Sequence, residues 1–594
     1  MRFRTLGKWD DRAASKGLIY VAQLIDELLF DFTLDSYKPS AMNTALLIKE
    51  AADTVKSIKA GIIKSPNLAH IIDELCLNLS KDEVAKSLIS VDLRGINATL
   101  KNPKIHENSK STVIDLLKQQ LPLKIYKKKN EDLLIQELGT TQDISKLRTL
   151  TRSYITTLLN SGYSADSIRQ KSQKFFFYSN DRISNNEAII DYFEMFATEP
   201  ALHTVFYRAP EHIREFVEPA KRLGIHILDA IENQENNEAI ARFSLRAGEV
   251  YLKLEKIPGR DPSSVKSAAD SKVEALQTLI GLYHHKESPA RIHECLVSDE
   301  EGTRYTKVSK TVHPMHKCQD STPTVASKRL AGFIKTFTLE QPSFRKFHRS
   351  AELHSLALSS DSLENQMINL WIALESLIPS SDNETSQIVH LSDSVMPFLN
   401  IIYIEKLLVR FFKDLMFWNR RLAKNLFRRV EASGIVSKLS RLLSLEEYQD
   451  LRQELENSFG DFHLLKDRYL HLTNLLSSPK NIVSTLESHK TRVDWQLRRI
   501  YRARNMIVHE GQTPSYTEIL VENTHDYLDT IMNALMLMAS KRNTIFTVAQ
   551  GFKMMELNYN AYHASLNEKN AEFTRDNIDH LLLRFSLRAN NSSI

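Results

Sequence analysis

The residues best suited to chemistry lie in the segment RARNMIVHEG at positions 502–511. Here Arg504, Asn505 and His509 follow the spacing R-N-x-x-x-H. An imidazole can give or take a proton near neutral pH, and a guanidinium can stabilise charge that develops on a phosphate. The segment therefore combines a group that can transfer a proton with a group that can bind an anion.

A helix is expected to position these residues. Apolar side chains recur at steps of three and four over residues 493–508, and Gly511 and Pro514 supply a stop signal. His509 is therefore expected in the last turn, where the negative end of the helix dipole and the neighbouring Glu510 favour its charged form. Glu510 is accordingly a supporting residue.

The helical geometry separates the two main candidates. Arg504 precedes His509 by five residues, which is about 140° around a helix. A shared site then requires the arginine to reach around the helix or the last turn to distort. The alternative is structural, with Arg504 in a surface ion pair and His509 stabilised by the helix dipole alone.

A second motif lies upstream, NLWIALESLIP at positions 369–379, whose apolar residues form a helical stripe while Glu375 points elsewhere. The chain resembles the HEPN superfamily, in particular its Apea-like branch, in three features taken together. They are this helix, the R-N-x-x-x-H helix end and the apolar helix expected at 516–540. The resemblance covers roughly residues 340–545.

The resemblance implies a metal-independent endoribonuclease without a cofactor. It also implies a homodimer, or a higher even oligomer, in which two copies of the 493–511 helix bring arginines and histidines together. In such a site the 2′-hydroxyl of RNA would attack the adjacent phosphate without a metal ion, with Arg504 and His509 as catalytic residues. Asn505 would orient the histidine or the scissile phosphate, and Glu375 would support the site. Such proteins commonly act in bacterial antiviral defence, as toxins or in abortive infection, which would make RNA the substrate and a phage-derived molecule or a nucleic acid the trigger.

The composition is that of a globular protein built from several domains. The chain has 594 residues, of which 42% are hydrophobic and 25% charged, and its net charge of +5 permits an anionic partner. Its three cysteines are too few for a disulfide framework, and no apolar run reaches membrane-spanning length. We expect a cytoplasmic protein with no membrane partner.

The low content of glycine and proline, 16 and 17 residues, predicts a predominantly all-α fold. We expect a multi-helix N-terminal region at 1–235 that senses a trigger or restrains the nuclease, with helices at 18–32, 41–60, 68–79, 111–120 and 144–160. A small α+β module is expected at 236–330, with strands at 242–257, 291–297 and 304–308 and a helix at 263–284. Residues 331–594 would form the HEPN-type helical bundle.

Basic and aromatic residues alternate over positions 403–430. We expect most of these aromatic side chains to be core and the cations to guide RNA electrostatically. The residues expected to bind RNA are Arg420, Arg421, Lys424, Arg428 and, on the motif helix, Arg502.

Four alternatives remain open from the sequence. Imidazoles and thiolates at His293, Cys295, His313, His316 and Cys318 could hold zinc, although their spacing matches no known finger.

Residues 153–170 resemble a helix-turn-helix that could read DNA, and KIYKKK at 124–129 could bind phosphates or be a solvated loop. The helical domain could also be a non-catalytic module that dimerises and binds RNA or a nucleotide for a regulatory protein.

Overall fold

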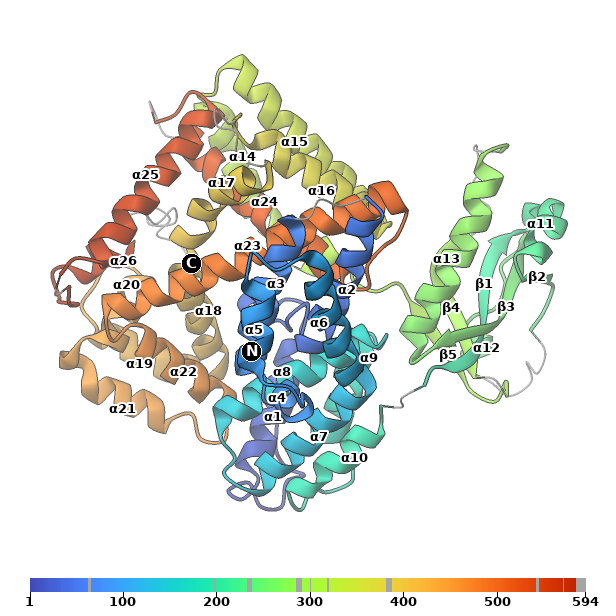
Figure 1. Ribbon diagram of the computed structural model, residues 1–594, viewed down its shortest axis with the longest axis horizontal. Helices are drawn as coiled ribbons and strands as arrows, with labels where there is room; N and C mark the ends of the chain where they lie inside the picture. Colours follow the sequence, from blue (N-terminus) through green and yellow to red (C-terminus); the bar gives the residue numbers. More distant parts are fainter. Residues whose placement is uncertain are drawn as a thin grey trace. The chain divides into compact units, whose positions relative to one another are not determined.

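The computed structural model describes residues 1–61, 66–196, 199–231, 238–284, 291–299, 301–317, 320–380, 387–540, 544–569 and 571–583. The chain divides into two compact units. We call residues 1–153 and 313–594 the helical unit, and residues 154–312 the sheet unit. The structure confirms a predominantly helical protein with a small α+β module (Figure 1).

The sheet unit contains five described strands in the order β2-β3-β1-β4-β5, all paired antiparallel. The strands are β1 (Ala201–Pro210), β2 (Ile225–Leu228), β3 (Glu249–Gly259), β4 (Arg291–Asp299) and β5 (Tyr305–Ser309), and the helices are α9 (Ala165–Gln173), α10 (Ile189–Glu194), α11 (Val217–Arg222), α12 (Glu238–Ala241) and α13 (Pro262–Gly281). Asp261 caps the start of α13, since its side chain accepts a hydrogen bond from the backbone of Ser264.

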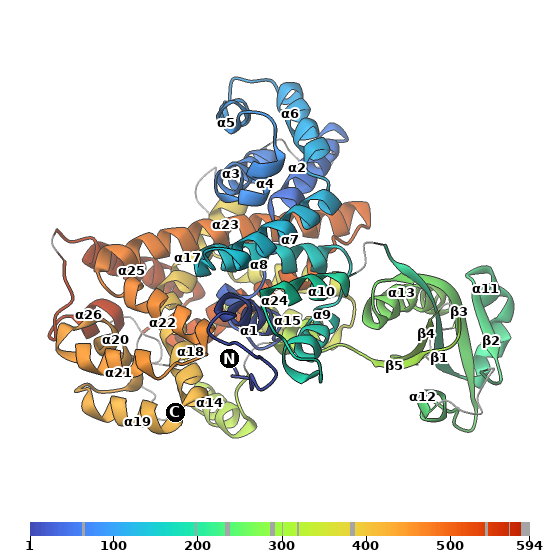
Figure 2. The same ribbon diagram turned by 90° about the horizontal axis from the view of Figure 1, so that it is seen from below.

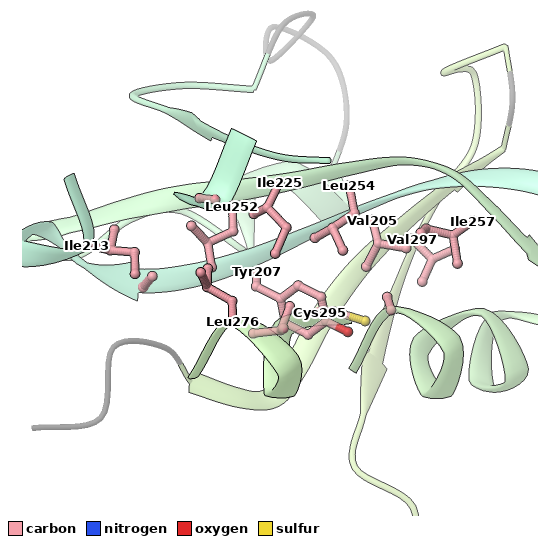
Figure 3. Packing of buried hydrophobic residues seen from close by; sticks show 14 of the residues in the cluster. Val205, Tyr207, Ile213, Ile225, Leu252, Leu254, Ile257, Leu276, Cys295 and Val297 are labelled. Carbon is pink, nitrogen blue, oxygen red and sulfur yellow. The ribbon is translucent and has the colours of Figure 1, made fainter. Parts of the chain in front are cut away.

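Both faces of the sheet are covered by apolar side chains. On one face, Val205 and Tyr207 of β1 pack with Cys295 of β4 and with Leu276 of α13 (Figure 3). On the other face, Phe206 of β1 packs with a second apolar cluster. Because the central strand is buried on both faces, it lacks the alternation that marks a half-exposed strand. This explains why β1 is not predicted, whereas β2 is an edge strand of four residues, too short to show a period.

The helical unit consists of two sequence-distant sets of helices. The first set is α1 (Lys16–Leu28), α2 (Thr44–Lys59), α3 (Pro66–Lys81), α4 (Glu83–Leu88), α5 (Leu93–Lys101), α6 (Glu107–Gln120), α7 (Leu123–Gly139) and the first part of α8 (Ile144–Asn160). The second set is α14 (Pro323–Thr336), α15 (Gln341–Ser359), α16 (Leu363–Leu377), α17 (Gln387–Ile401), α18 (Tyr403–Trp418), α19 (Arg420–Arg429), α20 (Ile435–Ser444), α21 (Gln449–Asn457), α22 (His463–Leu475), α23 (Pro479–Glu510), α24 (Thr517–Ala539), α25 (Val548–Leu566) and α26 (Ile578–Leu583).

The observed units differ from the predicted domains. The N-terminal helices belong to the same unit as the C-terminal helices, and the sheet unit begins well before residue 236. The expected loop at 124–129 is part of α7, because Tyr126 is buried and hydrogen-bonded to Asp82 at 2.6 Å. The predicted helix at 144–160 has the bounds of α8.

A buried ion cluster helps to join the two helix sets. Glu27 of α1 lies 3.2 Å from Arg410 of α18 and 3.1 Å from Arg468 of α22, and Asp414 lies 2.8 Å from Arg468. Burial by itself raises the pKa of Glu27, but Arg468, the N-terminal amine and Arg410 outweigh burial and lower it to about 2. The side chain is therefore a buried carboxylate that depends on cations from the C-terminal set.

Helix α23 runs through the helical unit and carries the R-N-x-x-x-H motif (Figure 1). It contacts α3 of the first set and α16, α17, α22, α24 and α25 of the second set. Helices α2, α3, α5 and α6 lie together on one side of α23 (Figure 2). The motif helix is thus packed by both ends of the sequence.

Candidate functional site

The two ends of α23 follow from local sequence signals. The side chain of Ser478 accepts a hydrogen bond from the backbone of Asn481, and Pro479 occupies the first helical position. At the other end Gly511 adopts the left-handed conformation, with φ of 62°, and its N–H donates to the carbonyl of Met506. The helix therefore ends at Glu510, and His509 lies in the last turn as predicted.

The structure brings Arg504 and Asn505 together. Both side chains are half-buried, and Nη1 of Arg504 donates to Oδ1 of Asn505 at 3.0 Å. Nε of Arg504 is buried, and it has no hydrogen-bond partner within the described residues. The guanidinium is therefore held by Asn505 on one side, while its Nε is covered by protein.

His509 is exposed in the last turn of α23. Within the described ranges, no hydrogen bond or ion pair joins its ring to Arg504 or Asn505. This agrees with the angular separation expected on a helix. In a single chain, the arginine and the histidine therefore share the end of α23 but point to different sides of the helix.

The second motif packs against the first. Trp371 of α16 is buried, and its ring lies 5.6 Å from that of Tyr501 on α23, centroid to centroid. Glu375 is half-buried and accepts a hydrogen bond from Gln387, the first residue of α17. The two motifs that carry the resemblance are thus adjacent helices of one core.

Glu510 faces the N-terminal helix set. Its Oε1 accepts a hydrogen bond from Oγ of Ser57 on α2 at 3.5 Å, a weak contact at the limit of hydrogen-bond length. The last residue of the motif helix therefore lies beside the first helix set.

Arg502 belongs to a buried charge cluster rather than to the surface. We use the term buried charge cluster for Arg499 and Arg502 of α23, Glu50 of α2 and Glu74 of α3. Arg502 is 3% exposed and lies 2.8 Å from Glu50, while Arg499 lies 3.0 Å from Glu50 and 2.5 Å from Glu74. The prediction that Arg502 binds RNA is therefore corrected, since its guanidinium is directed at an internal carboxylate.

The two acids of this cluster differ in their electrostatics. Burial raises the pKa of Glu50, but Arg499 and Arg502 outweigh burial and lower it to about 2. Burial dominates for Glu74 and raises its pKa, since Arg499 is its main compensating charge. Glu50 is therefore the principal counterion of the two arginines.

The remaining predicted RNA-binding residues line the outer side of α19. Arg420, Arg421, Lys424 and Arg428 are exposed. The opposite side of α19 is buried, as Ala423, Leu426 and Phe427 show. The helix thus presents a row of cations to solvent, which can hold an RNA backbone.

Most aromatic residues near α19 are core, as predicted. Phe411 and Phe427 are buried, and the half-buried Trp418 packs edge-on against Phe3 at 4.9 Å. Phe417 is the exception, with 79% of its surface exposed. It is an exposed aromatic ring that immediately precedes the cationic helix.

The metal cluster suggested by the sequence is not formed by the described residues. Cys295 is buried in the sheet core, and burial raises the pKa of its thiol to about 12, which disfavours the ligating thiolate. His313 is hydrogen-bonded to Ser360 and Gln366, whereas His293 and His316 are exposed. Cys318 lies outside the described residues.

The helix-turn-helix candidate has the expected local form but an unsuitable surface. Gly162 has a φ of +95°, and Ser164 caps α9. The carboxylate of Asp261 accepts hydrogen bonds from the backbone and hydroxyl of Ser164, at 2.7 and 3.0 Å. A carboxylate at this helix start repels phosphate, and Lys171 donates to a backbone carbonyl instead.

Comparison of the chain with models of known protein families, with curated proteins and with solved structures finds no match. No helix in the described part of the chain combines the length and the apolar character needed to cross a membrane. One feature with metal-binding chemistry was missed by the sequence reasoning, namely His354, His525 and Asp529. Its signal was the H-x-x-x-D spacing within the helix expected at 516–540.

Proposed function

We propose that this protein is a metal-independent endoribonuclease that acts as a homodimer through Arg504, Asn505 and His509. The observation that carries the proposal is the end of α23, where an arginine held by Asn505 precedes an exposed histidine by five residues. The adjacent LWIALESL helix supports the same interpretation, because the resemblance rests on both motifs together.

The reaction requires three tasks at one phosphate. A base removes the proton of the 2′-hydroxyl, whose oxygen attacks phosphorus, and an acid protonates the departing 5′-oxygen. The products are a 2′,3′-cyclic phosphate and a 5′-hydroxyl. His509 suits the transfer of protons, and Arg504 suits stabilisation of charge on the phosphoryl oxygens.

The dimer follows from the number of groups available. One chain offers a single His509, whereas the reaction uses a base and an acid. A second copy would supply the other histidine if the two helix ends meet across a symmetric interface. The cations of α19 would guide the RNA, and Glu375 and Glu510 would support the helix end.

The biological setting is proposed from the resemblance alone. Apea-like HEPN proteins commonly act in antiviral defence or as toxins. In that setting the N-terminal helices and the sheet unit would sense a phage-derived or nucleic-acid trigger, or restrain the nuclease.

The test compares RNA cleavage in the presence of a chelator by the parent protein and by Arg504→Ala and His509→Ala. We expect each substitution to lower the cleavage rate by about 100-fold or more. His348→Ala is a matched control, since His348 is also an exposed helical histidine. Equal cleavage by all four proteins would refute the catalytic assignment, and RNA binding without cleavage would favour the non-catalytic module.

A further inference from the structure

Two helices of the helical unit place three metal-ligating side chains together. Helix α24 supplies His525 and Asp529, which the spacing of four residues puts on one face of the helix. Helix α15 supplies His354. One potential ligand atom from each residue lies within 4.8 Å of the other two.

Each histidine lies near a different oxygen of Asp529, at a distance longer than that of a direct hydrogen bond. Nε2 of His354 lies 3.4 Å from Oδ1 of Asp529, and Nε2 of His525 lies 3.5 Å from Oδ2. A hydrogen bond between an imidazolium and a carboxylate is shorter, about 2.7–2.9 Å. Ligands on a tetrahedral zinc ion, with bonds of about 2.0–2.2 Å, are separated by about 3.3–3.5 Å.

The separation of the two rings agrees with shared coordination. The ring centroids of His354 and His525 are 5.1 Å apart, and the ring planes are inclined by 13°. Two imidazoles bound to one tetrahedral zinc ion have centroids about 5 Å apart. The rings are stacked, and the lone pair of an imidazole lies in the plane of its ring, so sharing one ion requires one of the two rings to turn.

The burial of the two histidines gives a second reason for a ligand, whereas the side chain of Asp529 is 38% exposed. The side chain of His525 is 5% exposed, and that of His354 is 20% exposed. Nε2 of His354 is itself buried and makes no hydrogen bond within the described residues. A buried nitrogen without a partner costs free energy, and coordination would satisfy its lone pair.

The site has an open side. His525 and Asp529 line a cavity of about 750 Å³ that also receives Lys317, Lys406 and Lys413. Three protein ligands and one free position facing a cavity are the arrangement of a zinc ion that retains water or an external oxygen ligand. Lys317 and Lys406 are paired with carboxylates, since Lys317 lies 2.5 Å from Glu518 and Lys406 lies 3.1 Å from Asp526.

We propose that His354, His525 and Asp529 form a site for a divalent transition metal ion of the zinc class, whose fourth position faces this cavity. The ligands lie on α15 and α24, whereas Arg504 and His509 lie on α23. The proposed metal site thus uses none of the residues assigned to RNA cleavage. It can therefore be tested without RNA.

The test measures metal binding by the full-length, untagged chain. We expect the purified protein to take up about one zinc ion per chain, and Co²⁺ to give the intense visible absorption of a tetrahedral site. His525→Ala and Asp529→Asn should each weaken Zn²⁺ binding by about tenfold or more. His348→Ala on α15 removes an exposed histidine and should bind as the parent does.

Circular dichroism establishes that each variant is folded, and His354→Gln provides a further variant that retains a similar side-chain volume. The proposal is overturned if the folded parent binds neither Zn²⁺ nor Co²⁺. It is also overturned if the folded ligand variants bind Zn²⁺ as tightly as the control. Loss of RNA cleavage has no bearing on either outcome.

Discussion

Arg502 and Arg504 lie two residues apart on α23, yet their surroundings differ. Arg502 is 3% exposed and belongs to the buried charge cluster, where Glu50 lies 2.8 Å away. Arg504 is half-buried at the end of the helix, where it donates a hydrogen bond to the neutral amide of Asn505 at 3.0 Å. The same residue type therefore has two surroundings on one helix.

Position along the helix decides whether an arginine stabilises the fold or is available to a substrate. In the buried charge cluster, the carboxylates of Glu50 and Glu74 neutralise the arginines. These ion pairs link α2 and α3 to α23. The helix end keeps cationic and imidazole groups near the surface, where a substrate phosphate can reach them. Substitutions in these regions test this difference, beginning with the largest expected effect.

The largest effect on stability is expected from Arg499→Ala. This change leaves Glu50 and Glu74 buried with less positive charge, and loss of one partner of a buried ion cluster costs about 3–5 kcal/mol. Urea denaturation of the helical signal measures the free energy of unfolding. Arg504→Ala, as a matched arginine on the same helix, should cost no more than about 1 kcal/mol.

A stability loss for Arg504→Ala as large as that for Arg499→Ala would contradict the distinction between the two regions. Such a result would show that the helix end is held by charge to the same extent as the cluster.

The next largest effect concerns acid stability. The pKa of Glu50 is about 2 in the folded protein, whereas the ordinary pKa of a glutamate is 4.5. The carboxylate therefore contributes stability that is present above about pH 4.5 and is lost as the pH falls toward 2, by at most about 3 kcal/mol. Glu50→Gln should flatten the dependence of unfolding on pH in this window.

Glu74 opposes this trend in part, because its pKa is raised and its protonation stabilises the folded state as the pH falls. Glu50→Gln and Glu74→Gln should therefore change the acid slope in opposite directions. The same slope for both variants would show that Glu50 is not the main counterion.

The smallest effect is expected on α19. Replacing Arg420, Arg421, Lys424 or Arg428 singly with Ala should weaken RNA binding a few-fold and lower the slope of log K against log salt by about 0.7 per lost phosphate contact. Arg429→Ala is the matched control, since Arg429 lies 2.6 Å from Glu454. Salt-independent RNA binding by all of these proteins would remove α19 from the proposed RNA path.

Local signals made part of the molecule predictable. Gly511 ends α23, Ser164 begins α9, and both positions are readable because the residue itself supplies the conformation or the capping oxygen. The long apolar periodicity similarly marked α8 and α24. These features need no knowledge of distant parts of the chain.

The remainder depends on contacts between distant positions. Arg499 and Glu50 are separated by 449 positions, so their pairing has no local pattern. In the sequence, Arg502 is therefore indistinguishable from an exposed cation, because its partner Glu50 lies far away in the chain. His354 and Asp529 were missed for the same reason, because the third ligand lies on another helix.

The central claim is tested most directly by comparing Arg504→Ala with Arg502→Ala in one single-turnover RNA cleavage assay, with the rate expressed per folded molecule. The account predicts that Arg504→Ala loses about 100-fold or more in rate while it remains as stable as the parent. Arg502→Ala should instead lose stability and keep most of its rate per folded molecule. The reverse pattern, or full cleavage by Arg504→Ala, would contradict the account.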